Sequence, residues 1–143
     1  MENKMKVEFD SQSINEGFAR VAVAAFVANL NPTMDELADI KTAVSEAVTN
    51  AIIHGYEDAA GTVELACVLT GQMVTITVTD HGKGIADIEQ AKMPFYTSKP
   101  ELERSGMGFA FMEAFMDEVC VDSVVGNGTC VKMEKRLGRR DES

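Results

Sequence analysis

Hydrophobic and polar residues along this chain follow two different periods. Alternation over residues 5–9 predicts a short edge strand with one buried face. Between residues 15 and 29, apolar residues recur at helical spacing, which predicts a helix that ends before Pro32. Arg20 falls outside its predicted buried stripe, which consists of Phe18, Val21, Ala22, Ala25 and Phe26.

A longer helix is predicted directly after Pro32. Thr33 and Glu36 have the spacing of a capping box, in which each side chain bonds the backbone N–H of the other residue. Gly55 is a natural stop, because glycine readily takes the left-handed conformation that ends many helices. The apolar positions in between recur at i, i+3, i+4 and i+7, and we expect them to anchor the core: Leu37, Ile40, Val44, Ala47, Val48, Ala51 and Ile52.

Two β-hairpins are predicted in the remaining sequence. The first joins residues 62–70 to residues 73–79 through a Gly-Gln turn. The second joins residues 118–125 to residues 129–135 through a turn that contains two glycines. Antiparallel pairing is therefore expected within each pair of strands.

The segments around the second hairpin complete the predicted order. Residues 85–91 predict a short helix, residues 94–106 a long irregular loop typical of a lid, and residues 108–116 another helix. Residues 136–143 are expected to form a solvated tail. This order predicts one α+β domain over residues 1–143, a two-layer sandwich with helices on one face of a mixed, mostly antiparallel sheet.

Composition narrows the classes of partner. The formal net charge is −10, so the chain lacks the basic character of proteins that grip nucleic acid, and we expect no direct nucleic-acid partner. A nucleotide can still bind locally, because backbone N–H groups, one Mg²⁺ and a few cations suffice for a phosphate chain. Without a leader or an apolar run of 18 residues, we expect a cytoplasmic protein with no membrane contact. The three cysteines have no metal-ligand spacing and are expected to be buried free thiols.

A first cluster of candidate residues lies on the long predicted helix. Glu46, Asn50 and His54 follow one another at i, i+4 and i+8, which aligns them along one face. A solvated helix face explains this pattern without any function. Alternatively, the carboxylate can accept a proton, and the amide oxygen one turn away can coordinate Mg²⁺.

Two glycine-rich segments supply further candidates. Directly after a predicted strand comes Asp80-His81-Gly82-Lys83-Gly84. An Asx turn explains it, but a buried carboxylate there can also accept a hydrogen bond from an exocyclic amine such as that of adenine. A helix is opened by Ser105-Gly106-Met107-Gly108, where backbone N–H groups favour a phosphate. The sequence contains no Walker A motif, no dinucleotide-binding glycine motif and no catalytic loop of the eukaryotic protein-kinase type.

Taken in order, these three clusters resemble the asparagine box and the two glycine boxes of the gyrase, chaperone, histidine kinase and MutL (GHKL) superfamily. The likeness covers nearly residues 4–135 and includes residues 18–21, 32–37 and 97–109. Over this length the chain is similar to the sporulation anti-sigma-F factors, a family of serine kinases. The resemblance implies the ATP-binding fold of that superfamily.

The same resemblance implies a function and a set of site residues. It implies a homodimer that binds ATP or ADP with Mg²⁺, inhibits a sigma factor of the sigma-F type and phosphorylates a serine of an anti-anti-sigma protein. Glu46 is implied as the general base, Asn50 as the Mg²⁺ ligand, Asp80 as the adenine reader, and Arg20 as part of the surface that meets both protein partners. The further implied nucleotide contacts are His54, Gly55, Gly82, Gly84, Thr97, Ser98, Lys99, Arg104, Ser105, Gly106, Met107, Gly108 and Thr129.

Alternative functions stay open on the sequence alone. A related switch kinase for a stress-response sigma factor has the same chemistry and a different partner. A nucleotide-gated binding protein without catalysis needs Glu46 only to satisfy its helix face. Histidine-kinase activity is disfavoured, because the only histidines, His54 and His81, lie inside or beside the nucleotide boxes.

Overall fold

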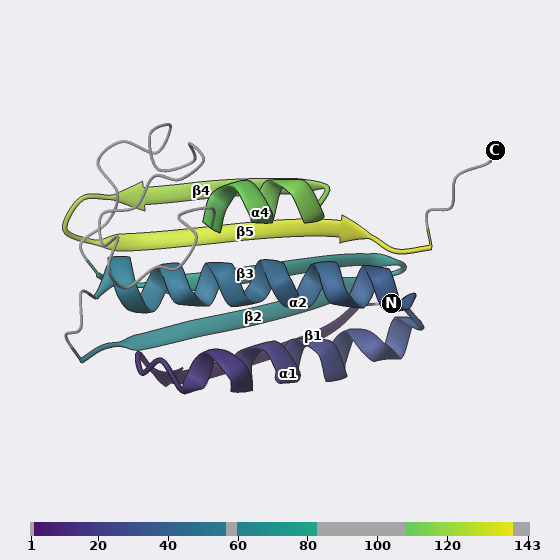
Figure 1. Ribbon diagram of the computed structural model, residues 1–143, viewed down its shortest axis with the longest axis horizontal. Helices are drawn as coiled ribbons and strands as arrows, with labels where there is room; N and C mark the ends of the chain where they lie inside the picture. Colours follow the sequence, from purple (N-terminus) through teal and green to yellow (C-terminus); the bar gives the residue numbers. More distant parts are fainter. Residues whose placement is uncertain (1, 57–59, 83–107, 139–143) are drawn as a thin grey trace.

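The computed structural model describes residues 2–56, 60–82 and 108–138 (Figure 1). The predicted helix over 85–91 and the predicted lid over 94–106 lie outside this part of the chain. In chain order the elements are β1 (Glu2–Asp10), α1 (Asn15–Val27), η1 (Ala28–Leu30), α2 (Met34–Thr49), η2 (Asn50–Gly55), β2 (Thr62–Thr70), β3 (Met73–Asp80), α4 (Gly108–Phe115), β4 (Glu118–Val124) and β5 (Gly128–Arg136).

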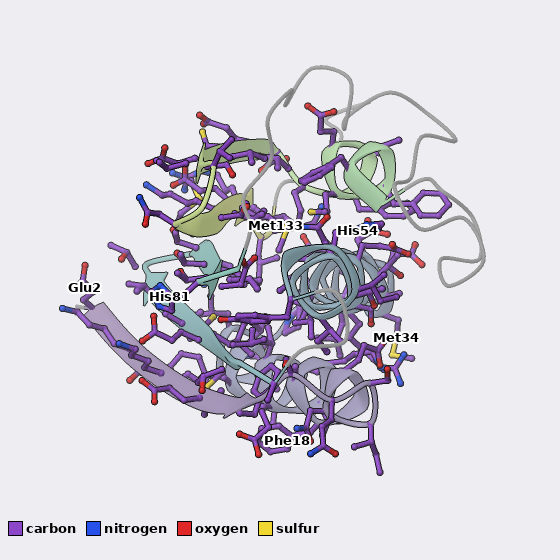
Figure 2. The ribbon with its side chains drawn as sticks, turned by 90° about the vertical axis from the view of Figure 1, so that its left-hand side faces the viewer. Glu2, Phe18, Met34, His54, His81 and Met133 are labelled. Atoms are coloured by element: carbon purple, nitrogen blue, oxygen red, sulfur yellow. The ribbon has the colours of Figure 1, made fainter. Side chains whose placement is uncertain are left out.

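The strands form one five-stranded sheet in the order β1-β2-β3-β5-β4. Helices α1, α2 and α4 cover one of its faces, as Figures 1 and 2 both show, so the predicted α+β sandwich is confirmed. Every neighbouring pair among these strands is antiparallel, and the parallel pair of a mixed sheet is not seen in the described residues. No helix in this part of the chain is long and apolar enough to cross a membrane.

Both predicted hairpins are confirmed, and the alternation within them explains the core. In β2 and β3 every second side chain points toward the helices and is buried, because successive residues of a strand face opposite sides of the sheet. The buried residues of these two strands are Val63, Leu65, Cys67, Leu69, Val74, Ile76, Val78 and Asp80. Asp80 is the one charged residue among them, and it ends β3.

Helix α2 is the central element of the helical layer, and its predicted start is confirmed. The Glu36 N–H donates to Thr33 Oγ1 at 3.0 Å, and the Thr33 N–H donates to Glu36 Oε1 at 2.8 Å. Its apolar face is buried as predicted, apart from a partly buried Leu37. The helix does not stay α-helical to Gly55: it ends at Thr49 and passes into η2, a π-helical segment.

The buried face of α1 differs from the predicted stripe. The fully buried residues of this helix are Ala19, Val23 and Val27. Phe18 and Val21 are 52% and 62% exposed, and Ala25 is exposed as well, so their prediction as core residues is wrong. Helix α1 is apolar around a wide arc, and small side chains such as Ala19 let it pack closely along α2. Periodicity alone does not choose between two overlapping stripes.

Two smaller predictions are also corrected. The solvated tail begins later than residue 136, because Arg136 ends β5, Leu137 is buried and the Gly138 N–H donates to Glu36 Oε2 at 2.9 Å. Among the cysteines only Cys67 is buried. Cys120 is exposed because it lies on the outward face of the edge strand β4.

Candidate functional site

The predicted nucleotide-site residues that the structure describes lie at one end of the molecule. Helix α2 and strand β3 both finish there, and η2 contacts β3 and the neighbouring strand β5 (Figure 1). Figure 2 looks onto this end, with His54 on the helical layer and His81 on the sheet side. Residues far apart in the sequence therefore line the same end of the sandwich.

Asp80 is the chemically most unusual residue of this end. Its side chain is 3% exposed, and its carboxyl accepts the Gly82 N–H at 2.9 Å and the backbone N–H of Thr129. Burial raises the pKa of this carboxyl, while the hydrogen bonds from Gly82 and Thr129 and the nearby His81 act in the opposite direction. A carboxyl held at such a position is a ready acceptor for a donor on a ligand.

The start of β5 closes tightly onto Asp80. Gly128 has φ = +101°, and a Cβ at this position would collide with the backbone carbonyl oxygen of Asp80. Only glycine therefore allows this approach of the two backbones. Thr129, the residue paired with Asp80 across the strands, is 3% exposed, and its Oγ1 lies 2.9 Å from Ser123 Oγ.

The other half of the site is formed by α2 and η2. Glu46 lies near the end of α2, Asn50 opens η2, and His54 lies close to its end; all three are partly buried. The π-helical turn widens the helix after Thr49, so His54 does not continue the straight line that i, i+4, i+8 spacing predicts. Such turns within helices are frequent at functional sites.

Side chains at this end carry oxygen atoms of the kinds that accept a hydrogen bond from a base or bind Mg²⁺. Asp80 offers a buried acceptor, and the close approach at Gly128 leaves no side chain over its backbone. Asn50 supplies an amide oxygen, the hard type of ligand that Mg²⁺ prefers. The described residues contain no cluster of three or more His, Cys, Asp or Glu side chains that could cage a metal alone.

The structure brings together only part of the predicted set. Asp80, Gly82 and Thr129 lie side by side, Gly55 ends η2, and Gly108 begins α4. Arg20 lies on α1, outside these elements, where its Nη1 is 3.8 Å from Glu16 Oε1. The predicted contacts that fall outside the described residues are Gly84, Thr97, Ser98, Lys99, Arg104, Ser105, Gly106 and Met107.

Two structural residues of this end do not emerge from the sequence reasoning. Gly128 belongs to a turn in the sequence, and its contact with Asp80 depends on the pairing of β3 with β5. Tyr56 follows the asparagine box, and its hydroxyl hydrogen-bonds residues on two other segments. The polar tip of Tyr56, just beyond a predicted helix end, is the one local signal that could have drawn attention to it.

Comparison with known sequences identifies the family. The family model described as histidine kinase-like ATPase domain matches residues 10–135. The anti-sigma F factor of Anoxybacillus flavithermus is 59% identical over 138 residues, covering 96% of this chain and 94% of that protein. The anti-sigma F factor of Geobacillus kaustophilus is 58% identical over 140 residues (97% and 96%), and that of Clostridium novyi 60% over 136 residues (94% and 95%).

Solved structures share the fold. The RsbU and RsbW domains of a Mycobacterium tuberculosis protein match with a TM-score of 0.67 at 24% identity, over 94% of this chain and 32% of that longer chain. The catalytic domain of the histidine kinase ThkA matches with a TM-score of 0.56 at 18% identity, over 93% and 96%. The family model over residues 10–135 and the identity of 58–60% to relatives matched over nearly their whole length show that the chain belongs to the anti-sigma F factor family, within the histidine kinase-like ATPase domains.

Proposed function

We propose that this protein is a cytoplasmic anti-sigma factor that binds a sigma factor of the sigma-F type and uses Mg-ATP to phosphorylate a serine of an anti-anti-sigma protein. The observation that carries the proposal is the identity of 58–60% to anti-sigma F factors over at least 94% of the chain. The buried acceptor at Asp80 and the oxygen donors of α2 and η2 support a nucleotide site in the same chain.

In this proposal Asp80 reads the adenine. Its carboxyl is held by Gly82 and Thr129, and it accepts a hydrogen bond from the exocyclic amine of the base. Because the carboxyl is buried, a base that lacks this donor would leave it without a ligand partner, and such a loss discriminates strongly between ligands. Thr129 and Gly82 thus support the acceptor from both sides.

Glu46 and Asn50 serve the other end of the nucleotide. Mg²⁺, when bound, neutralises charge on the phosphates. Asn50 contributes an amide oxygen to it. The other contacts proposed for the nucleotide are His54, Gly55, Gly84, Thr97, Ser98, Lys99, Arg104, Ser105, Gly106, Met107 and Gly108. Glu46, one helical turn before Asn50, accepts the proton of the incoming serine hydroxyl as general base.

Helix α1 offers a surface for the protein partners. Arg20, with 42% of its side chain exposed, lies between Phe18 and Val21 in the sequence, and both of these apolar side chains are more than half exposed. Exposed apolar side chains and an exposed arginine on one helix are features that protein-binding surfaces share. We propose that this surface meets the sigma factor and the anti-anti-sigma protein, and that the protein acts as a homodimer.

The test measures phosphate transfer to serine. The purified protein is incubated with labelled Mg-ATP and the candidate anti-anti-sigma protein, alongside Glu46→Gln. We expect the variant to lose about 10²–10⁴-fold in transfer rate, the range typical of removing a general base, with nucleotide affinity retained. The matched control is Glu118→Gln, an exposed glutamate on β4, which should transfer phosphate at the wild-type rate.

The outcomes separate the alternatives. Equal transfer by wild type and Glu46→Gln would contradict the role of Glu46 as base. Nucleotide binding and sigma binding without any transfer by the wild type would favour a nucleotide-gated binding protein. Capture of a stress-response sigma factor in preference to a sigma-F type would replace the proposed partner while leaving the chemistry intact.

A further inference from the structure

Tyr56 connects three separate segments at the site end of the molecule. Its hydroxyl donates to the carbonyl oxygen of Thr62, at the start of β2, at 2.7 Å. The same hydroxyl accepts the backbone N–H of His81, directly after β3, also at 2.7 Å. Its own N–H donates to the carbonyl oxygen of Ala51 at 3.3 Å, across the wide turn of η2. One residue therefore joins η2, β2 and the turn that follows Asp80.

The ring of Tyr56 is seated as specifically as its hydroxyl. A Cβ built on Gly61 would collide with the Tyr56 ring at Cε1, Cδ1 and Cζ. Glycine at this position thus leaves the space in which the ring lies. The ring is partly buried and packs against the hydrophobic core, and these apolar contacts fix the position of the side chain.

The described start of the turn after β3 is held by two hydrogen bonds to its backbone N–H groups. The N–H groups of His81 and Gly82 are held by Tyr56 Oη and by Asp80 Oδ1, respectively. The side chain of His81 lies 3.7 Å from Glu64 Oε2, but it is 64% exposed, and an exposed ion pair adds little. Tyr56 therefore ties this turn to the end of η2.

We propose that Tyr56 is a positioning residue for nucleotide recognition. It fixes the turn directly after Asp80 relative to η2, the segment that begins with Asn50. This inference rests on the proposed function, in which Asp80 reads adenine and Asn50 serves the phosphate side. A bound nucleotide spans both halves, so the spacing between them sets how well the base meets its acceptor. Tyr56 thereby supports the preference for adenine over a base without the exocyclic amine.

The experiment compares ATP with inosine triphosphate, which carries a carbonyl oxygen in place of the adenine amine. Dissociation constants for both are measured with the wild type, Tyr56→Phe and Glu64→Gln. We expect the wild type to prefer ATP, and Tyr56→Phe to lose about three- to thirtyfold in ATP affinity with a much smaller change for inosine triphosphate. Glu64→Gln, which removes the carboxylate that faces His81 and Lys6 but leaves the Tyr56 contacts in place, should keep the wild-type ratio.

A second variant covers the case in which Phe disturbs the fold. Gly61→Ala keeps the hydroxyl but displaces the ring, so it should also reduce the ATP preference. A purely structural role would lower the thermal midpoint and both affinities together without moving their ratio. An unchanged ratio in Tyr56→Phe and Gly61→Ala, with a wild type that prefers ATP, overturns the role of Tyr56. A wild type that binds neither nucleotide contradicts the proposed function itself.

Discussion

Helix α2 runs between two ends of the molecule, and the hydrogen bonds at these two ends have different roles. At its start, Thr33 and Glu36 cap each other, and Glu36 also accepts the Gly138 N–H, so these bonds satisfy backbone groups that a helix start and a chain segment leave open. At the end of the molecule where α2 finishes, the N–H groups of Gly82 and Thr129 donate to Asp80 of β3, a buried carboxyl whose charged form is disfavoured by burial. The bonds at the first end stabilise the fold, while those at the second hold a carboxyl group whose charged form is more stable in water than at this buried position.

This contrast predicts which substitutions should change ligand binding and which should change protein stability. Changes near Asp80 should weaken ligand binding more than they weaken the protein, and changes at the capping box should do the reverse. Burying a carboxyl costs free energy, and a site for a ligand donor is a reason to do so. Three variants, from the largest expected effect to the smallest, test this separation.

Gly128→Ala should have the largest effect on ATP binding. The added methyl meets the carbonyl oxygen of Asp80, and the left-handed φ of +101° adds backbone strain. Because strand backbone cannot yield as a flexible side chain does, we expect β5 to shift from Asp80. ATP binding should be lost, measured by calorimetric titration, together with a lower thermal midpoint.

Gly126→Ala is the matched control for that variant. Gly126 lies in the same turn with φ = +86°, but a Cβ there meets no atom within 4 Å among the described residues. It should therefore carry a similar backbone strain and keep ATP affinity. Equal loss of ATP binding in both variants would show that turn strain, and not the approach of β5 to Asp80, controls the site.

Asp80→Asn should separate binding from stability most clearly. The amide keeps an oxygen for the Gly82 N–H but loses the charged acceptor for the base, so ATP affinity should fall about ten- to a hundredfold. Without nucleotide, the free energy of unfolding should not fall, because the cost of burying a carboxylate is removed. Calorimetric titration and denaturant unfolding measure the two quantities. Unchanged ATP affinity would contradict the assigned role.

The wild type and Asp80→Asn should also differ in how their free energies of unfolding depend on pH. The pKa of Asp80 is raised in the folded protein above its ordinary 3.8, so the unfolded chain releases this proton first as the pH rises. The contribution of Asp80 to stability is therefore greatest below 3.8 and is lost as the pH rises through the folded pKa. The wild type should gain stability relative to Asp80→Asn as the pH falls through this window, and a relative loss would contradict the raised pKa.

The same two ends differ in how well sequence predicts them. The capping box is a local pattern, and the Thr33 and Glu36 side chains form it as expected. At the site end, the order of the boxes predicts Asp80 at a strand end. It does not predict that the Thr129 N–H donates to Asp80 or that the neighbouring His81 N–H donates to Tyr56. Those bonds depend on strand pairing and on the course of η2, which are set by contacts between distant segments.

The two long helices show the same limit in the core. The apolar stripe of α2 is narrow and flanked by polar residues, so its period fixes which face is buried. Helix α1 carries apolar residues around a wide arc, and burial falls on Ala19 and Val23 while Phe18 stays half exposed. Periodicity identifies a helix, but the choice of buried face is made by packing against α2.

The smallest effect is expected at the start of α2. Thr33→Ala removes the side-chain acceptor of the Glu36 N–H, which should lower the free energy of unfolding by about 1 kcal/mol and the thermal midpoint by about 4 °C. ATP affinity should stay at the wild-type value, because this cap lies at the opposite end of α2 from Asn50. Thr33→Ser keeps the hydroxyl and should behave as the wild type in both measurements. A loss of ATP affinity in Thr33→Ala at an unchanged midpoint would break the separation between the two ends, because it would tie the stabilising cap directly to the site.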